Sequence, residues 1–126
     1  GDTDVNIAVS RLEKGSDQWG EPAMISTDNE FSNQNPSLFL AANNEIWCLY
    51  TSQRGREPGK DNMQYTSVIK RQISRDDGRT WSAPEVVLPE EGTFARQPIQ
   101  VLSNGRWIYG LWRERTCRRP KHLRGL

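Results

Sequence analysis

A set of residues matched at one fixed spacing constrains the fold of this 126-residue chain more than any other feature of its sequence. Trp19 and Trp81 stand 62 positions apart. The same offset relates two pairs of prolines and four pairs of apolar residues, namely Pro22 with Pro84, Pro36 with Pro98, Ile46 with Ile108, Trp47 with Tyr109, Leu49 with Leu111, and Tyr50 with Trp112. Because a repeated sequence folds into a repeated unit, we predict parts of tandem copies of one structural unit.

The segments between the turns have the character of β-strands. β-Branched and aromatic residues occur in short runs, and these runs are separated by turn sequences such as Asn43-Asn44 and Asn104-Gly105. No segment has a helical period with a cap, so we expect an all-β chain. The predicted strands cover residues 4–10, 22–26, 36–41, 45–52, 65–74, 84–88, 98–102 and 106–113.

A four-stranded antiparallel unit repeated in tandem is typical of a β-propeller blade. With the strand at 36–41 innermost, residues 36–88 form one whole blade. The outer half of one blade precedes it and the inner half of another follows it. Residues 1–113 are therefore predicted to form a partial propeller of about two blades. Since propellers close with roughly four to eight blades, completion requires either the rest of a longer protein or several copies of the chain.

Residues 114–126 break the repeat at a point where another strand is expected. Six Lys or Arg fall between Arg113 and Arg124 without any strand-like alternation. A basic arm for an anionic partner and a truncated C-terminus both explain this segment, and the repeat favours truncation. The formal charge of the whole chain is only +1, which gives no reason to expect nucleic acid or a membrane surface as a partner.

The sequence Ser-Arg-Asp-Asp-Gly-Arg-Thr-Trp at residues 74–81 predicts a tight hairpin turn. Four positions carry the prediction. Ser74 begins the motif, and the Asp76 side chain can bond turn amides that have no strand partner. Gly78 suits a position with positive φ. Trp81 can lay a large apolar surface over the sheet. The expected role of this turn is structural.

The spacing Ser-x-Asp-x-Gly-x-Thr-Trp resembles the Asp box, or BNR repeat, of the sialidase superfamily. The similarity covers residues 4–112, through Asn-Pro-Ser-Leu-Phe-Leu, Ile-Trp-Cys-Leu-Tyr-Thr-Ser-Gln and Gly-Thr-Phe-Ala-Arg-Gln-Pro-Ile. It implies a six- or seven-bladed propeller that acts on terminal sugars of glycans, in most cases as a secreted protein. No signal peptide is visible in the first residues, so an extracellular location is expected from the resemblance alone.

In antiparallel blades, alternate loops lie on opposite faces. The loops opposite the 74–81 turn, at residues 27–35, 53–64 and 89–97, are long and polar, and we expect binding there. The candidate ligands for an acidic sugar are Arg96 for its carboxylate, Gln34, Asn35 and Gln97 for its hydroxyls, and Arg54 for added positive field. Alternatively, the same inner-strand residues tie neighbouring blades together.

Asp61, in the loop at 53–64, is the carboxylate that we predict as a general acid, with an ordinary solvated loop as the alternative. Asp28 and Glu30 occupy the equivalent loop one blade earlier. No Cys or His spacing suggests zinc, and no Gly-rich phosphate loop is present. Asp76-Asp77-Gly78 lacks the further ligands of a calcium loop. We therefore predict no metal and no cofactor.

The resemblance implies more specific chemistry for the whole protein. Sialidases hold the sialic acid carboxylate with three Arg and use a Tyr–Glu pair and an Asp. The Arg-Ile-Pro motif of that family is absent here, and no Tyr–Glu pair can be assigned. Rhamnose–glucuronate lyases have similar repeats and also bind an acidic sugar. We expect a hydrolase or a lyase for a terminal acidic sugar, with this chain supplying scaffold and part of the site.

Two other interpretations come from different functional classes. One is a non-catalytic propeller that binds a glycan or a protein. The other is an inactive fragment, because half-blades leave strand edges unpaired and such edges favour aggregation. Even if the whole protein is a hydrolase or a lyase, the isolated chain is expected to be inactive as an enzyme, and the expressed fragment is expected to be poorly soluble.

Overall fold

The computed structural model describes residues 3–56 and 63–114. Within these ranges the chain contains β-strands and two short 3-10 turns but no α-helix, as the sequence predicts. The elements are β1 (Ala8–Val9), β2 (Ala23–Met24), β3 (Phe31–Leu40), η1 (Ala42–Asn44), β4 (Ile46–Arg54), η2 (Gln64–Thr66), β5 (Val68–Ser74), β6 (Glu85–Leu88), β7 (Thr93–Phe94), β8 (Gln100–Val101), β9 (Trp107–Ile108) and β10 (Trp112–Arg113).

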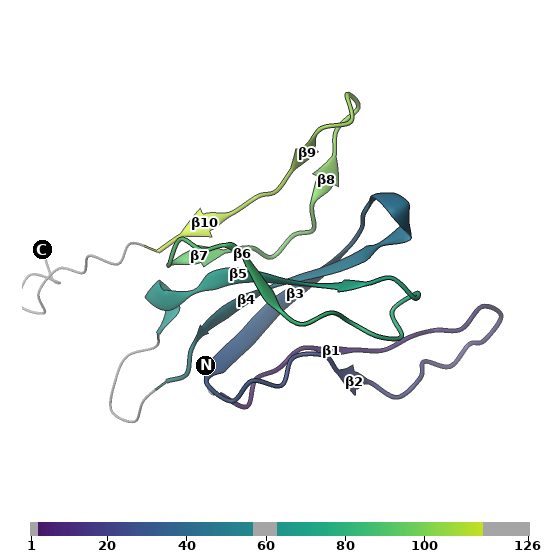
Figure 1. Cartoon of the computed structure of the whole chain (residues 1–126), viewed down its shortest axis with the longest axis horizontal. Coiled ribbons are helices and arrows are strands. Elements are labelled where there is room, and N and C mark those ends of the chain that lie inside the picture. The colour runs from purple at the N-terminus through teal and green to yellow at the C-terminus, as the bar shows by residue number, and fades with distance from the viewer. Residues whose placement is uncertain (1–2, 57–62, 115–126) are drawn as a thin grey trace, which may run out of the picture.

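Four consecutive strands form the central sheet, in the order β3-β4-β5-β6 (Figure 1). All three pairings are antiparallel, and each strand lies beside its neighbour in the sequence. Ile46 of β4 pairs with Leu40 of β3 on one side and with Ser74 of β5 on the other. This arrangement confirms the four-stranded antiparallel unit predicted for residues 36–88.

The N-terminal pair β1–β2 covers one face of the central sheet. Ile7, Cys48 and Tyr50 form a buried cluster there, and Ile25 and Trp81 pack against it. Burial raises the pKa of the Cys48 thiol to about 12. We call this side of the sheet the N-terminal face.

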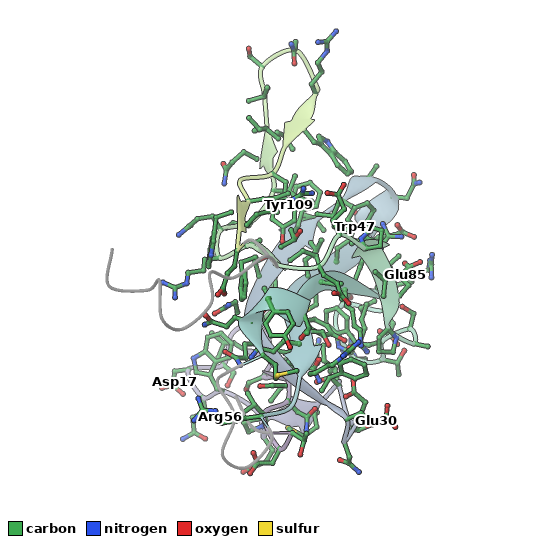
Figure 2. The ribbon with its side chains drawn as sticks, turned by 90° about the vertical axis from the view of Figure 1, so that its left-hand side faces the viewer. Asp17, Glu30, Trp47, Arg56, Glu85 and Tyr109 are labelled. Carbon is green, nitrogen blue, oxygen red and sulfur yellow. The ribbon has the colours of Figure 1, made fainter. Side chains whose placement is uncertain are left out.

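The C-terminal strand pairs cover the opposite face, which we call the C-terminal face. Phe39, Leu49 and Ile69 are buried there together with Ala95. Trp47 and Tyr109 pack against this cluster, and Figure 2 shows both side chains at the same end of the sheet, below the projecting β8–β9 hairpin. The first five residues of β4, 46–50, are all apolar because neighbours along the strand point to opposite faces and both faces are covered.

Several strand boundaries differ from the prediction. β3 begins at Phe31 rather than at Pro36, with a bulge between Gln34 and Ser37. Ser32 and Asn33 were expected in a loop because they are polar, but both are fully buried in the sheet. Buried polar groups of this kind are tolerated where hydrogen bonds satisfy most of them, which composition alone does not reveal.

The C-terminal strands are also organised differently. The single strand predicted at 106–113 is divided into β9 and β10. β10 pairs with β7, which lies in a segment predicted to be a loop, while β9 pairs with β8. Together these two pairs correspond to the β3–β4 hairpin of the central sheet. β7 and β8 take the place of β3, and the longer interval between them takes the place of the bulge in β3.

The structure also shifts part of the repeat by one residue. The last pair before the turn is Leu40 with Ile46 in the β3–β4 hairpin and Val101 with Trp107 in the β8–β9 hairpin. Equivalent positions in these hairpins are thus 61 apart rather than 62. Trp107, and not Ile108, takes the place of Ile46. Its ring accordingly faces inward and packs edge-on against Phe39, with the ring centroids 4.8 Å apart.

Candidate functional site

The turn at 74–81 uses its polar groups internally. The Asp76 carboxylate accepts hydrogen bonds from the backbone N–H of Thr80 at 2.8 Å and from Ser74 Oγ at 2.9 Å. Ser74 Oγ in turn accepts the backbone N–H of Gly78, which has a φ of 84°. The side-chain and backbone hydrogen bonds from Thr80 lower the pKa of Asp76 to about 2. Ser74 and Asp76 thus bond amides of their own turn.

Trp81 closes the same turn. Its indole Nε1 donates to the carbonyl oxygen of Gly78 at 3.2 Å, and its ring packs on the cluster of the N-terminal face. Arg11 reaches the turn from the N-terminal pair and donates to the carbonyl oxygen of Asp77 at 2.9 Å. These contacts tie the turn to the N-terminal face and to the N-terminal pair.

Gln34 and Asn35 lie at the bulge inside β3 rather than in a loop before it. The Gln34 amide donates to Ser32 Oγ at 2.8 Å, and the Asn35 amide donates to Thr51 Oγ1 at 3.3 Å. Asn35 has a φ of 55°, a left-handed value that a short polar residue tolerates. Both amides donate hydrogen bonds within the central sheet. The sequence interpretations had expected them to bind a sugar or to join neighbouring blades.

Arg96 follows β7, in the interval that corresponds to the bulge of β3. The side chain is exposed, and its guanidinium carbon lies 5.4 Å from the ring centroid of Trp112. Trp112 is 44% exposed and stacks on buried Phe94, with the centroids 5.1 Å apart and the planes inclined by 9°. The three side chains therefore form a layered stack, which we call the Arg96 stack, with the cation outermost.

Arg96 differs from most arginines of the described chain in its charge partners. Five others pair with carboxylates, namely Arg11 with Glu13, Arg71 with Glu85, Arg75 with Glu45, Arg79 with Asp77, and Arg113 with Glu90. No carboxylate of residues 3–56 or 63–114 pairs with Arg96. Gln97, next to it, is exposed as well. An exposed guanidinium without a carboxylate partner is free to bind one from a ligand.

Arg54 lies on a different side of the central sheet. It is the last residue of β4 and pairs with Phe31, so its side chain leaves the sheet on the N-terminal face. Arg96, by contrast, belongs to the segment that covers the C-terminal face. The structure therefore does not bring Arg54 and Arg96 together, and no hydrogen bond among the described residues joins Arg96 to Gln34 or Asn35.

Near Arg54, the structure assembles a charged cluster that the sequence did not reveal. Lys70 of β5 lies 3.8 Å from a carboxylate oxygen of Asp28 and 4.2 Å from the ring centroid of Phe31. The other carboxylate oxygen of Asp28 accepts the backbone N–H of Phe31 at 3.0 Å. Only 13% of the Lys70 side chain is exposed. The Asp28 carboxylate thus caps the start of β3, and its negative charge is paired with the positive charge of Lys70.

Some predicted features fall outside the described residues. Asp61 is one of them, and most of the basic segment at 114–126 is another. Over residues 3–56 and 63–114, no group of three or more His, Cys, Asp or Glu side chains is arranged to hold a metal ion. The same ranges contain no helix long and apolar enough to cross a membrane.

The comparison with protein families agrees with this architecture. A family model described as a BNR repeat-like domain matches residues 1–124. Because the match spans nearly the entire sequence, the chain belongs to the BNR repeat-like family, and the resemblance to sialidase-type repeats is confirmed. No curated protein matched the chain.

Proposed function

We propose that this chain forms part of the glycan-binding surface of a sialidase-like β-propeller, and that Arg96 binds the carboxylate of a terminal acidic sugar. The observation that carries the proposal is the Arg96 stack, in which an exposed guanidinium has no carboxylate partner among the described residues. A guanidinium binds a carboxylate through two parallel charge-assisted hydrogen bonds, which makes it suited to sialic or uronic acids.

The stack supports binding in a second way. Trp112 holds the guanidinium through a cation–π contact, and Phe94, which is 4% exposed, holds Trp112. A cation that is already positioned loses less conformational entropy when a ligand binds. Gln97 is exposed next to Arg96 and supplies an amide for a sugar hydroxyl. The proposal therefore keeps Arg96 and Gln97 as ligands and omits Gln34 and Asn35, whose amides have partners.

The propeller part of the proposal is supported by the sheet order. The central sheet has the strand order of one blade, with the pair β1–β2 on one face and the pairs β7–β10 and β8–β9 on the other. These flanking pairs correspond to the outer half and the inner half of neighbouring blades. On this proposal the chain contributes binding, the reacting groups come from the rest of the propeller, and the protein acts on glycans outside the cell.

Titration of the chain with sugars, followed by NMR, tests the proposal. N-Acetylneuraminic acid and a methyl glucuronide are the acidic probes, and a methyl glucoside is the neutral control. We expect the acidic sugars alone to shift the side-chain N–H signals of Arg96 and Trp112. Equal shifts with the glucoside, or no shift of the Arg96 signal with either acidic sugar, would show that this residue does not bind a sugar carboxylate.

A further inference from the structure

A cavity lies between two hairpins at the end of the central sheet away from β7 and β10. Its walls come from the β1–β2 hairpin, at residues 8–24, and from the 74–81 turn, and its volume is about 360 Å³. Figure 1 shows both hairpins at this end of the sheet. We call this space the inter-turn cavity. Each hairpin is complete within the described residues, so the cavity does not depend on strands that the rest of the propeller supplies.

The two walls of the inter-turn cavity are fixed to one another. Arg11 Nε donates to the carbonyl oxygen of Asp77 at 2.9 Å, which joins the first hairpin to the turn. Within the first hairpin, Val9 pairs with Ala23, and the backbone N–H of Gly20 donates to the carbonyl oxygen of Arg11 at 2.8 Å. A cavity whose walls are already held in place loses less conformational entropy when a ligand enters.

Part of the lining is uncharged. Val9 and Ala23 contribute aliphatic side chains from paired positions, which point to the same side of the strand pair. Gly78 contributes only backbone. An adjoining cavity of about 250 Å³ shares these three residues and is also lined by Trp81. The two cavities therefore offer aliphatic and aromatic surface to the C–H groups of a ligand.

The remaining lining side chains are polar, and their charges balance. They are Arg11, Glu13, Gln18, Glu21 and Arg79. Arg11 is paired with Glu13. Glu21 and the Gln18 amide are exposed, and neither has a side-chain partner among residues 3–56 and 63–114. A carboxylate that only accepts hydrogen bonds and an amide that does both are thus available to a ligand.

This balance favours an uncharged ligand with hydroxyl groups. Glu21 comes from one wall and Arg79 from the other, so an anion is repelled by the first and a cation by the second. A hydroxyl group both donates and accepts, so neighbouring hydroxyls can donate to Glu21 and accept from Arg79. A pyranose ring combines such hydroxyls with a C–H face that suits the aliphatic part of the lining.

We propose that the inter-turn cavity binds an uncharged sugar residue, with Glu21 and Arg79 bonding its hydroxyls and with Val9 and Ala23 contacting its ring. This second glycan site is separate from Arg96 and prefers the other charge class of sugar. Its volume lies in the range of pockets that hold small molecules. The inference does not require that Arg96 binds a carboxylate.

NMR titration with two sugars that differ by one carboxylate tests the proposal. Methyl glucoside is the neutral probe, methyl glucuronide is the acidic probe, and glycerol, which has hydroxyls but no ring, is the control. The backbone N–H signals of Gly20 and Gly78 report on the cavity, while the side-chain N–H signal of Arg96 reports on the other site. We expect the glucoside to shift the two glycine signals more than the glucuronide does, and glycerol to leave them unchanged.

Three variants place the sugar in the cavity. Ala23→Phe fills the space from an exposed position and should abolish the glycine shifts with glucoside. Glu21→Ala should raise the Kd for glucoside by roughly two- to tenfold, the range expected for one hydrogen bond. Asp17→Ala is the matched control, because it removes an exposed carboxylate of the same hairpin that does not line the cavity. The dispersion of the backbone N–H signals checks that each variant is folded.

Four results would overturn the proposal. They are glycine signals that do not respond to glucoside, an equal or larger response to glucuronide or glycerol, an unchanged response in folded Ala23→Phe, and an equal effect of Glu21→Ala and Asp17→Ala. The Arg96 signal is read in the same spectra. Failure of carboxylate binding there is therefore seen separately from failure of the inter-turn cavity to bind the neutral sugar.

Discussion

The guanidinium of Arg96 lies over the ring of Trp112, 5.4 Å from its centroid, on the outer side of a stack whose inner layer is Phe94. The backbone pairing of β7 with β10 determines this contact, and the proposed function depends on it. β7 and β10 pair through Phe94 and Trp112, and this pairing places the two rings face to face. The interval between β7 and β8 then turns Arg96 onto the exposed ring, as interruptions of a strand commonly re-aim a side chain.

Removal of the Trp112 ring should weaken binding of an acidic sugar without abolishing it. An exposed cation–π contact contributes about 0.5–1 kcal/mol, so Trp112→Ala is expected to raise the Kd for a glucuronide by roughly two- to fivefold. Trp112→Phe keeps a ring face and should lose less. Titration calorimetry compares the three proteins. An unchanged Kd in Trp112→Ala would mean that the ring does not position the guanidinium.

Asp76 should make stability depend on acid pH. Its folded pKa of about 2 lies below the value of about 4 expected in the unfolded chain. The carboxylate therefore stabilises the fold above about pH 4, and this stabilisation is lost as the pH falls towards the folded pKa of about 2. Urea unfolding between these limits should show a smaller loss of stability with falling pH in Asp76→Asn than in the wild type. Parallel curves for the two proteins would contradict the hydrogen bonding described for the turn.

Two buried glutamines should respond oppositely to the same substitution. The Gln72 amide donates to the carbonyl oxygens of Ile25 and Ser82, and it accepts the hydroxyl of Tyr50 at 2.9 Å. Gln72→Met leaves these groups unpaired, at a cost on the order of 1–3 kcal/mol in the free energy of unfolding.

Gln53 is the matched control, since it is also 2% exposed but its Nε2 has no hydrogen-bond partner among residues 3–56 and 63–114. Gln53→Met is expected to be neutral or stabilising, because the substitution removes an unsatisfied donor at similar volume. Chemical denaturation measures both variants. A larger loss in Gln53→Met than in Gln72→Met would reverse the assignment of the two hydrogen-bonding environments.

The Cys48 thiol should be inert in the folded protein. It is fully buried, and burial raises its pKa to about 12, so almost no thiolate exists near neutral pH. Cys117→Ser leaves Cys48 as the only thiol of the chain. In that variant, an aromatic disulfide reagent should react only as urea unfolds the protein. Rapid modification in buffer without urea would mean that the cluster of the N-terminal face opens readily.

The sequence predicted the parts of the fold that local chemistry determines. The central strand order followed from the turns at Asn43-Asn44 and Asp77-Gly78, and the role of Asp76 followed from its spacing to Ser74 and Gly78. These signals are local because the groups that satisfy one another lie within a few residues.

What the sequence did not predict depends on contacts between distant segments. Asn33 was expected in a loop, but it is fully buried, and its side-chain amide donates to Asn6, 27 residues away, as well as to Asp28. In the sequence, Lys70 is an ordinary charged residue of a strand. Only the folded structure places Asp28 beside it. Arg96 was identified as a candidate, but its ring partner Trp112 lies across a strand pair whose register no local pattern specifies.

The most direct test of the proposed function is the affinity of three variants for a methyl glucuronide, measured against the wild type. Arg96→Ala is expected to raise the Kd by roughly tenfold or more, because a hydrogen bond to a charged group contributes about 1.5–3 kcal/mol. Arg96→Lys should retain part of the affinity. Arg106→Ala, at another exposed arginine on the β8–β9 turn, should retain all of it. An unchanged Kd in Arg96→Ala, or an equal loss in Arg106→Ala, would contradict the assignment of Arg96 as the carboxylate ligand.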